Sequence, residues 1–109
     1  MKMLTQAIRK RLPKLYAQEQ VPTADKVVHV KFFQPWGRWT WWAVEGEPTE
    51  DGDFKFFGFV QGLPGCDEWG YFVLSELESV RGPGGLRIER DLWFRPEKVA
   101  AISALQGAA

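Results

Sequence analysis

Six aromatic side chains stand within the eleven residues from Phe32 to Trp42, on both sides of a Pro-Trp-Gly turn. Aromatic and β-branched residues favour strands, and a short connection that contains Pro and Gly favours an antiparallel hairpin. We therefore expect a hairpin that turns at Gln34–Gly37. Because aromatic rings carry large apolar areas, such a chain has either an unusually aromatic core or an aromatic surface that meets a partner.

Further strand-like segments follow, separated by turn residues. The segments rich in aromatic and β-branched residues are Lys26–Phe33, Arg38–Glu45, Phe54–Gln61, Trp69–Leu74 and the charged edge segment Leu86–Phe94. Their short connections predict an antiparallel meander of four to five strands. In Phe54–Gln61 large apolar residues alternate onto both faces, so the second face must be covered by another element or form an apolar interaction patch.

Three helices are expected beside this sheet. Leu4, Ile8 and Leu12 recur at helical spacing after Thr5, a possible N-cap, and Pro13 ends this helix near Arg11. Ser75-Glu76-Leu77-Glu78 matches a capping box, which predicts a short helix near residues 75–80 that stops before the Gly82–Gly85 turn. A last helix is expected from Pro96, with Val99, Ile102 and Leu105 on its apolar side. The predicted fold class is α+β.

The size and composition of the chain fit one domain over residues 1–109. Fourteen basic residues balance fourteen acidic ones, so no overall charge draws the protein to nucleic acid. Cys66 is the only cysteine, which excludes an intramolecular disulfide and a zinc site of several thiolates. No apolar run has the length of a membrane span, so we expect a cytoplasmic protein without membrane association.

Candidate catalytic groups are sparse, and the sequence favours a protein that is not an enzyme. His29 and Cys66 are the one base–thiol pair, but nothing in the sequence brings them together, so no catalytic residue, cofactor or metal is predicted. The alternative is a metal-dependent enzyme that acts on nucleic acid, with carboxylates from a helix and an edge strand as metal ligands. These carboxylates are Glu76, Glu78, Glu89 and Asp91.

A protein partner is the preferred hypothesis, because Trp and Arg are the side chains that most often anchor protein interfaces. Trp36 stands in a turn that no packing pattern requires, and we expect it to be free of the core. Alternating Arg and acidic residues around Gly82–Gly85 suggest ion pairs that brace this turn. The partner-binding candidates are Trp36, Arg38, Trp39, Trp42, Arg81, Arg87, Glu89, Arg90 and Asp91.

Two other partners stay open as hypotheses. The aromatic block could stack on nucleic-acid bases, although the neutral net charge and the acidic loop beside the hairpin disfavour this. A homodimer that buries the second sheet face is the other.

Four segments resemble a bacterial domain-of-unknown-function family of small single-domain proteins. They are LYAQE at Leu15–Glu19, VKFFQPWGRWTWW at Val30–Trp42, FFGFVQG at Phe56–Gly62 and GYFVLSELESVRGPGGLRIERDLWF at Gly70–Phe94. Members of that family are commonly carried by plasmids, conjugative elements and phages. The resemblance implies a mobile-element protein that acts by binding, for instance by inhibiting a host defence complex such as a CRISPR or restriction system. It implies no role for any single residue.

Overall fold

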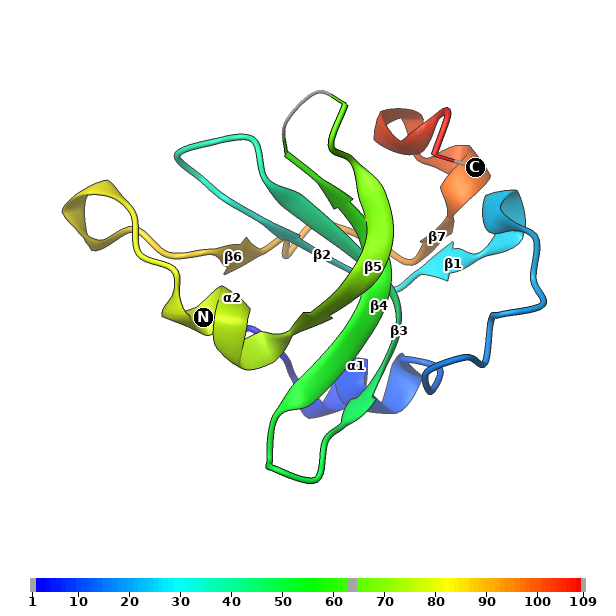
Figure 1. The fold of residues 1–109 in the computed structure, drawn as a ribbon, viewed down its shortest axis with the longest axis horizontal. Helices are drawn as coiled ribbons and strands as arrows, with labels where there is room; N and C mark the ends of the chain where they lie inside the picture. Colours follow the sequence, from blue (N-terminus) through cyan, green and yellow to red (C-terminus); the bar gives the residue numbers. More distant parts are fainter. Residues whose placement is uncertain (1, 63–64, 109) are drawn as a thin grey trace.

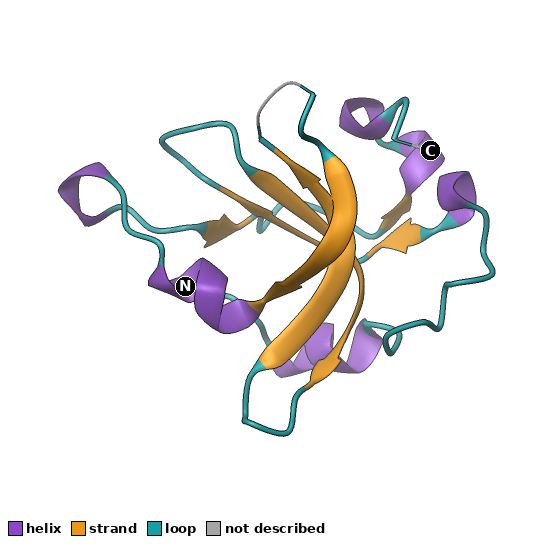
Figure 2. Cartoon of the chain, in the orientation of Figure 1, coloured by secondary structure: helices purple, strands orange, loops and turns teal. Residues whose placement is uncertain are grey.

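A twisted antiparallel sheet forms the centre of the computed structural model, which describes residues 2–62 and 65–108 (Figures 1 and 2). Met1, Leu63, Pro64 and Ala109 lie outside the described residues. Within those residues the sheet has five strands in the order β5-β4-β3-β2-β6. They are β2 (Val30–Phe33), β3 (Thr40–Pro48), β4 (Phe54–Gln61), β5 (Glu68–Val73) and β6 (Glu89–Arg90). The predicted α+β class and the antiparallel meander are confirmed.

A second, two-stranded antiparallel sheet pairs β1 (Val27–Val28) with β7 (Glu97–Lys98). The segment predicted as one strand is therefore divided at His29, whose N–H donates to the carbonyl of Ala43 at 2.9 Å. On one side of His29 the chain pairs with β7, and on the other side it pairs with β3. The division lets one segment join both sheets.

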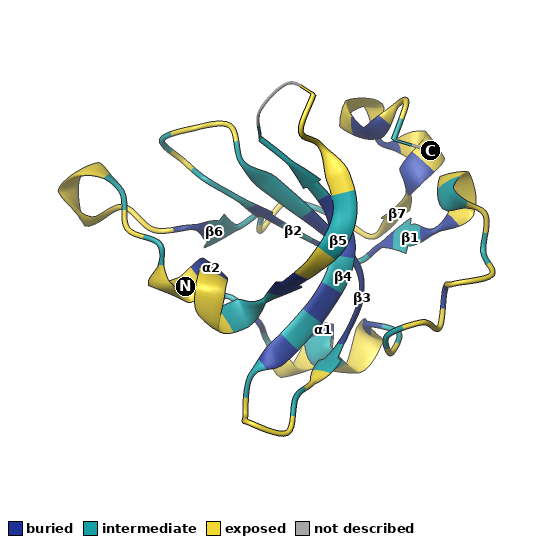
Figure 3. Cartoon of the chain, in the orientation of Figure 1, coloured by how far each residue is buried: buried dark blue, intermediate teal, exposed yellow. Residues whose placement is uncertain are grey.

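The first face of the large sheet packs against α1 (Gln6–Arg11) and α2 (Leu74–Ser79). Thr5 caps α1 as predicted, because its Oγ1 accepts the N–H of Ile8 at 3.2 Å, and the helix ends at Arg11. The buried residues of this cluster are Leu4, Ile8, Leu12, Val30, Phe32, Ala43, Phe54, Phe56, Phe72, Leu77 and Ile88. Figure 3 shows buried residues along the middle of the sheet and exposed ones toward the loops.

Part of the second face is covered by the C-terminal segment, which lies on the other side of the sheet from α2 (Figure 1). In place of the predicted helix after Pro96, the chain forms β7 and then two 3₁₀ turns, η3 (Val99–Ala101) and η4 (Ser103–Leu105). Val99, Ile102 and Leu105 are spaced by three residues, which matches the repeat of a 3₁₀ turn better than the 3.6 residues of an α-helix. All three are buried, together with Val28, Trp42, Val44 and Phe59.

The helix predicted from the Ser75 capping box begins earlier than expected. Its first residue is Leu74, and the Glu76 carboxylate accepts the N–H of Val73 at 3.3 Å. Ser75 instead donates its N–H and its hydroxyl to the carboxylate of Asp53, the residue just before β4. These hydrogen bonds from Ser75, with one from the Phe54 N–H, lower the pKa of Asp53. The predicted capping box of Ser75 and Glu78 is therefore wrong, because the Ser75 side chain bonds to Asp53.

Two remaining segments complete the described structure. The predicted edge strand Leu86–Phe94 is reduced to β6, because the chain before it forms the turn η2 (Pro83–Gly85) and the chain after it turns at Asp91. A further turn, η1 (Thr23–Asp25), precedes β1. No helix within residues 2–62 and 65–108 is long and apolar enough to cross a membrane.

Candidate functional site

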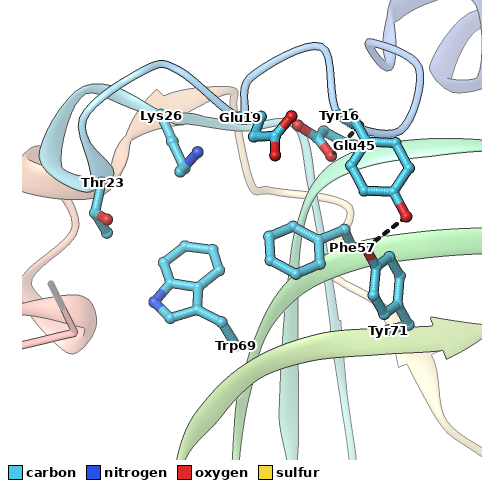
Figure 4. Close-up of a pocket in the computed structure, with 8 residues that line it drawn as sticks. All are labelled: Tyr16, Glu19, Thr23, Lys26, Glu45, Phe57, Trp69 and Tyr71. Carbon is cyan, nitrogen blue, oxygen red and sulfur yellow. Dashed lines mark hydrogen bonds between the residues drawn. The ribbon is translucent and has the colours of Figure 1, made fainter.

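An open pocket of about 280 Å³ lies on the second face of the sheet, between strands β4 and β5 and the loop that leads from α1 to β1 (Figure 4). We call it the aromatic pocket. Its lining residues are Tyr16, Glu19, Thr23, Lys26, Glu45, Phe57, Trp69 and Tyr71. Four of the eight are aromatic, so the site combines apolar ring faces with a few charged groups, which is the usual character of a small-ligand site.

Three of the rings come from neighbouring strands in fixed register. Phe57 on β4 pairs directly with Tyr71 on β5, and Trp69 lies two residues before Tyr71 on the same face. The Phe57 ring stacks on Trp69 at 5.9 Å between centroids and lies 5.1 Å from the Tyr71 ring in a tilted arrangement. Because all three residues are on paired strands, the backbone holds this wall of the pocket in place.

A β-bulge in β3 turns Glu45 toward the pocket. Ala43 pairs with Gly58 and Glu45 pairs with Phe57, so Val44 is an extra residue in the ladder. In a regular strand Ala43 and Glu45 would share one face of the sheet. The extra residue rotates Glu45 onto the face of Phe57. A negative charge is thereby placed on a face that is otherwise aromatic and aliphatic.

Glu45 also fixes the loop that forms the opposite wall. Its carboxylate is buried and accepts the N–H of Tyr16 at 2.8 Å and the N–H of Gln18 at 2.7 Å. Two residues along β3, the Glu47 carboxylate accepts the N–H of Leu15 at 2.9 Å. Backbone N–H groups stabilise a buried carboxylate as strong, charge-assisted donors. The loop therefore bends around two carboxylates of one strand.

Gln18 and Lys26 fasten the same loop from within. The side chain of Gln18 accepts the N–H of Val27 at 3.0 Å and donates to the carbonyl of Val44 at 2.8 Å, so it joins β1 to β3. Lys26 is buried, and its ammonium donates to the carbonyl of Gln18. The positive charge of Lys26 is thus held at the wall, on a backbone oxygen of the loop.

The two tyrosines meet at the mouth of the pocket, where the Tyr71 hydroxyl donates to that of Tyr16 at 3.1 Å (Figure 4). This hydrogen bond, burial, and the negative charges of Glu45 and Glu19 raise the pKa of Tyr71 to about 12. The Glu19 carboxylate is exposed, and within residues 2–62 and 65–108 no cation lies within 4 Å of it. Glu19 therefore places in the pocket lining a negative charge that no described cation pairs with.

None of the nine residues predicted for partner binding lines the aromatic pocket. Trp36 is half-buried and packs on the first core cluster and on Gly82, where a Cβ would come within 2.5 Å of the ring. The expectation that packing leaves Trp36 free is therefore wrong. Trp39 stacks on Trp41 at 6.3 Å and covers Gly62 in a similar way.

Trp42 is part of the second core cluster and is only 5 % exposed. Its indole N–H donates to the Gln61 side chain at 2.7 Å, and Lys31 lies over its ring at 4.9 Å. A partner could not reach this ring in the structure. Of the four candidates of the hairpin, Arg38 alone is exposed.

The charged candidates lie around β6 and the turn before it. Arg81 and Arg87 form a bridge across this turn, and both donate to the carbonyl of Glu78, so backbone bonds take the place of the expected ion pairs. Glu89 and Arg90 are on the edge strand, and Asp91 pairs with Lys31 at 3.4 Å.

The alternative carboxylate site does not assemble. Within residues 2–62 and 65–108, no group of three or more His, Cys, Asp or Glu side chains is arranged to hold a metal ion, so Glu76, Glu78, Glu89 and Asp91 do not meet in this way. Glu76 bonds to the N–H of Val73, and Asp91 faces Lys31. His29, whose carbonyl accepts a hydrogen bond from Arg11 of α1, is half-buried, whereas Cys66 is exposed.

No single sequence signal indicates the aromatic pocket, because its parts come from separate segments. The alternation of Trp69 and Tyr71 in a strand was visible, but Tyr16 stands in an irregular loop, and the bulge that turns Glu45 leaves no pattern in the sequence. Trp93, which follows β6, is 88 % exposed, and the strand pattern of its segment does not indicate this.

Comparison with known proteins gives the chain a family. No curated protein and no solved structure matches it. A family model described as a protein of unknown function, DUF2958, matches residues 3–108, which is nearly the whole chain. The protein therefore belongs to the DUF2958 family.

Proposed function

We propose that this protein is a non-catalytic binding protein that holds a positively charged organic group of a partner protein in the aromatic pocket. The observation that carries the proposal is the meeting of four aromatic rings with the Glu19 carboxylate, which has no cation within 4 Å among the described residues. Aromatic faces attract cations through their quadrupole, and rings combined with a carboxylate suit an alkylated ammonium or a guanidinium group.

The charge balance of the pocket supports a cation over an anion. Glu19 and Glu45 contribute two negative charges, against one positive charge from Lys26. The Lys26 ammonium is bonded to the carbonyl of Gln18, and Glu45 is bonded to two backbone N–H groups. Glu19 is left as the group that can pair with an incoming charge. Outside the pocket, Lys55 lies 4.5 Å over the Tyr71 ring, so this ring already interacts with one cation.

The biological context comes from the sequence resemblance and is part of the proposal. Carriage on a plasmid, conjugative element or phage makes a defence complex of the bacterial host the first class of partner to test, and the cytoplasm the first place to look. Affinity capture with the wild-type protein and a pocket variant side by side would separate partners held through the pocket from other bound proteins.

The proposal is tested with choline and its uncharged isostere 3,3-dimethylbutan-1-ol, which has the same shape. We expect choline to bind about tenfold more tightly, because a cation–π contact contributes roughly 0.5–2 kcal/mol. Binding is followed by NMR at the indole N–H of Trp69, which lines the pocket. Equal affinity for the two compounds would show that the pocket is merely apolar.

Two variants assign the binding to this pocket. Tyr71→Ala removes a ring that is 47 % exposed, and Glu19→Gln removes the free charge, so both should weaken choline binding without unfolding the protein. Glu50→Gln is the matched control, because Glu50 is an exposed carboxylate outside the pocket. A loss in the control as large as in Glu19→Gln would mean that only the overall charge matters.

A further inference from the structure

A second pocket lies on another part of the molecule, between α1 and the chain that follows β6, and its volume is about 210 Å³. It shares no residue with the aromatic pocket. We call it the arginine pocket, because Arg11, Arg90 and Arg95 line it with His29. Charge distinguishes the two pockets: carboxylates predominate in the first and guanidinium groups in the second.

The positive charges of the arginine pocket are not neutralised by the protein. Asp91 is the one acidic residue in its lining, and its carboxylate pairs with Lys31 at 3.4 Å. Within residues 2–62 and 65–108, no carboxylate lies within 4 Å of Arg11, Arg90 or Arg95. Uncompensated arginines around a concave surface attract anions and bind them by paired N–H donors.

The arginines retain free donors for such a ligand. Arg11 uses one nitrogen, Nη2, to donate to the carbonyl of His29 at 3.2 Å, and this bond holds the guanidinium at the pocket wall. Arg90 donates from Nε and Nη2 to the carbonyl of Lys2, at 3.1 and 2.9 Å, and keeps Nη1. Arg95 is exposed, and its side chain forms no hydrogen bond to the described residues. A guanidinium has five donors, so most remain available.

His29 lines the same pocket and responds to the charge of Arg11. Burial and then the charge of Arg11 lower the pKa of His29, so its imidazole is neutral near pH 7. Its Nδ1 atom is buried and has no hydrogen-bond partner among the described residues. Unpartnered buried polar atoms are uncommon in folded proteins and call for an explanation. An anion near Arg11 would offset the charge that disfavours the imidazolium.

We propose that the arginine pocket binds a phosphate group, with Arg11 and Arg95 as its main ligands and Arg90 adding positive charge. The guanidinium fork matches the oxygen pairs of phosphate, and several arginines favour a doubly charged anion over a single carboxylate. The pocket is open to solvent, so the ligand is free phosphate or a terminal phosphate on a larger molecule.

The experiment uses the full chain, in which His29 is the only histidine, so its imidazole signal in ¹H NMR needs no assignment. Inorganic phosphate and sulfate are titrated at constant ionic strength. We expect a saturable shift of the His29 signal and a rise of its pKa with sulfate, which does not itself titrate in this range. Arg11→Ala and Arg95→Ala should each weaken binding about tenfold or more. Arg38→Ala, at an exposed arginine of the hairpin, should leave it unchanged.

Adenosine 5′-monophosphate distinguishes a terminal phosphate from the free ion, with adenosine as the control that has no phosphate. Tighter binding of the monophosphate than of inorganic phosphate would support a terminal phosphate, and equal binding would support the free ion. No saturable shift of the His29 signal with any phosphate compound would overturn the proposal. So would equal binding by wild type, Arg11→Ala and Arg95→Ala with all three proteins folded by circular dichroism, because the site would then lie elsewhere.

Discussion

Tyr16 stands out at the scale of single residues. Among the described residues it is the one non-glycine with a positive φ, at 72°, a region that side chains other than Gly, Asn and Asp rarely adopt. The hydrogen bonds from Tyr16 and Gln18 to Glu45 hold the backbone there. Such strain persists only where the surroundings compensate for it, and it is frequent at functional sites. Here it directs the tyrosine ring, which is 61 % exposed, to the mouth of the aromatic pocket.

The tyrosine pair gives a prediction on pH. The chain has two tyrosines, so Tyr16→Phe leaves Tyr71 as the only phenol. Its pKa, about 12 in the wild type, should fall toward the ordinary value of 10.0, because the hydrogen bond to Tyr16 is the largest cause of the shift. Burial and the charges of Glu45 and Glu19 should keep it above 10.0. Phenolate absorbance measures this pKa, with circular dichroism to confirm that the protein stays folded.

The sign of the pH effect on stability follows from the same shift. A pKa raised in the folded state favours the neutral phenol, so its contribution is fully present below pH 10.0 and is lost as the pH rises to about 12. Tyr16→Phe should therefore flatten the fall in stability over this interval. A pKa that stays at about 12 in the variant would mean that the Tyr16 hydroxyl is not the cause.

At the scale of elements, the bulged pairing of β3 and β4 decides what the second face presents. Gly58 on β4 lies opposite Ala43, next to the extra residue Val44. A Cβ at Gly58 would come within 1.9 Å of the carbonyl oxygen of Trp42. The two backbones can approach this closely because glycine has no side chain.

Gly58→Ala should therefore lower the free energy of unfolding by about 3 kcal/mol or more, because neither backbone can move without breaking the ladder. Gly70 on β5 is a matched control, because it pairs directly with Gly58 and a Cβ at Gly70 would meet open space. Gly70→Ala should leave stability unchanged or raise it by up to about 1 kcal/mol. Urea denaturation measures both variants. Similar stabilities for the two would contradict the close approach at Gly58.

What the sequence could predict also divides at this scale. Period-two patterns predicted β4 with its observed bounds, Phe54–Gln61, and the Thr5 cap with Pro13 located α1, because these signals are local. Two local signals were misleading. The capping-box pattern at Ser75 fails because Ser75 bonds to Asp53, which is 22 residues away. The apolar spacing of Val99, Ile102 and Leu105 predicted an α-helix, but its three-residue repeat belongs to 3₁₀ turns over the second face.

The candidate site was harder to predict than the fold. A strand pattern indicates that Trp69 and Tyr71 share a face, but the pocket also needs the loop at Tyr16 and the bulge at Val44. Both depend on contacts between distant segments. The hairpin pattern indicates Trp36 and Trp42 as candidate contact residues, but Trp36 packs on Gly82 and Trp42 belongs to the second core cluster.

At the scale of the whole molecule, the sheet has two apolar faces, and the chain covers each with a different end. α1 and α2 cover the first face, and η3 and η4 cover the part of the second face around Phe59. The rest of the second face, around Phe57 and Tyr71, forms the aromatic pocket. The extent of the C-terminal segment therefore sets where the core ends and the aromatic pocket begins.

This arrangement makes the C-terminal segment essential for a stable protein. Leu105 is 1 % exposed, so Leu105→Ala should cost about 2–5 kcal/mol and lower the melting temperature by roughly 10 °C or more. Ala101→Ser, at an exposed position of η3, is the control and should change stability by less than about 0.5 kcal/mol.

Removal of the whole segment from Val99 onward tests its role as a cover. Val99, Ile102 and Leu105 together contribute roughly 5–9 kcal/mol of apolar burial, which is comparable to the total stability of a small domain. The shortened chain should expose Val44 and Phe59, bind a hydrophobic dye and self-associate in light scattering, since an uncovered apolar face seeks another surface. If it instead stayed monomeric with a native circular dichroism spectrum, the second face would not need this cover, and the homodimer hypothesis for that face would lose its physical basis as well.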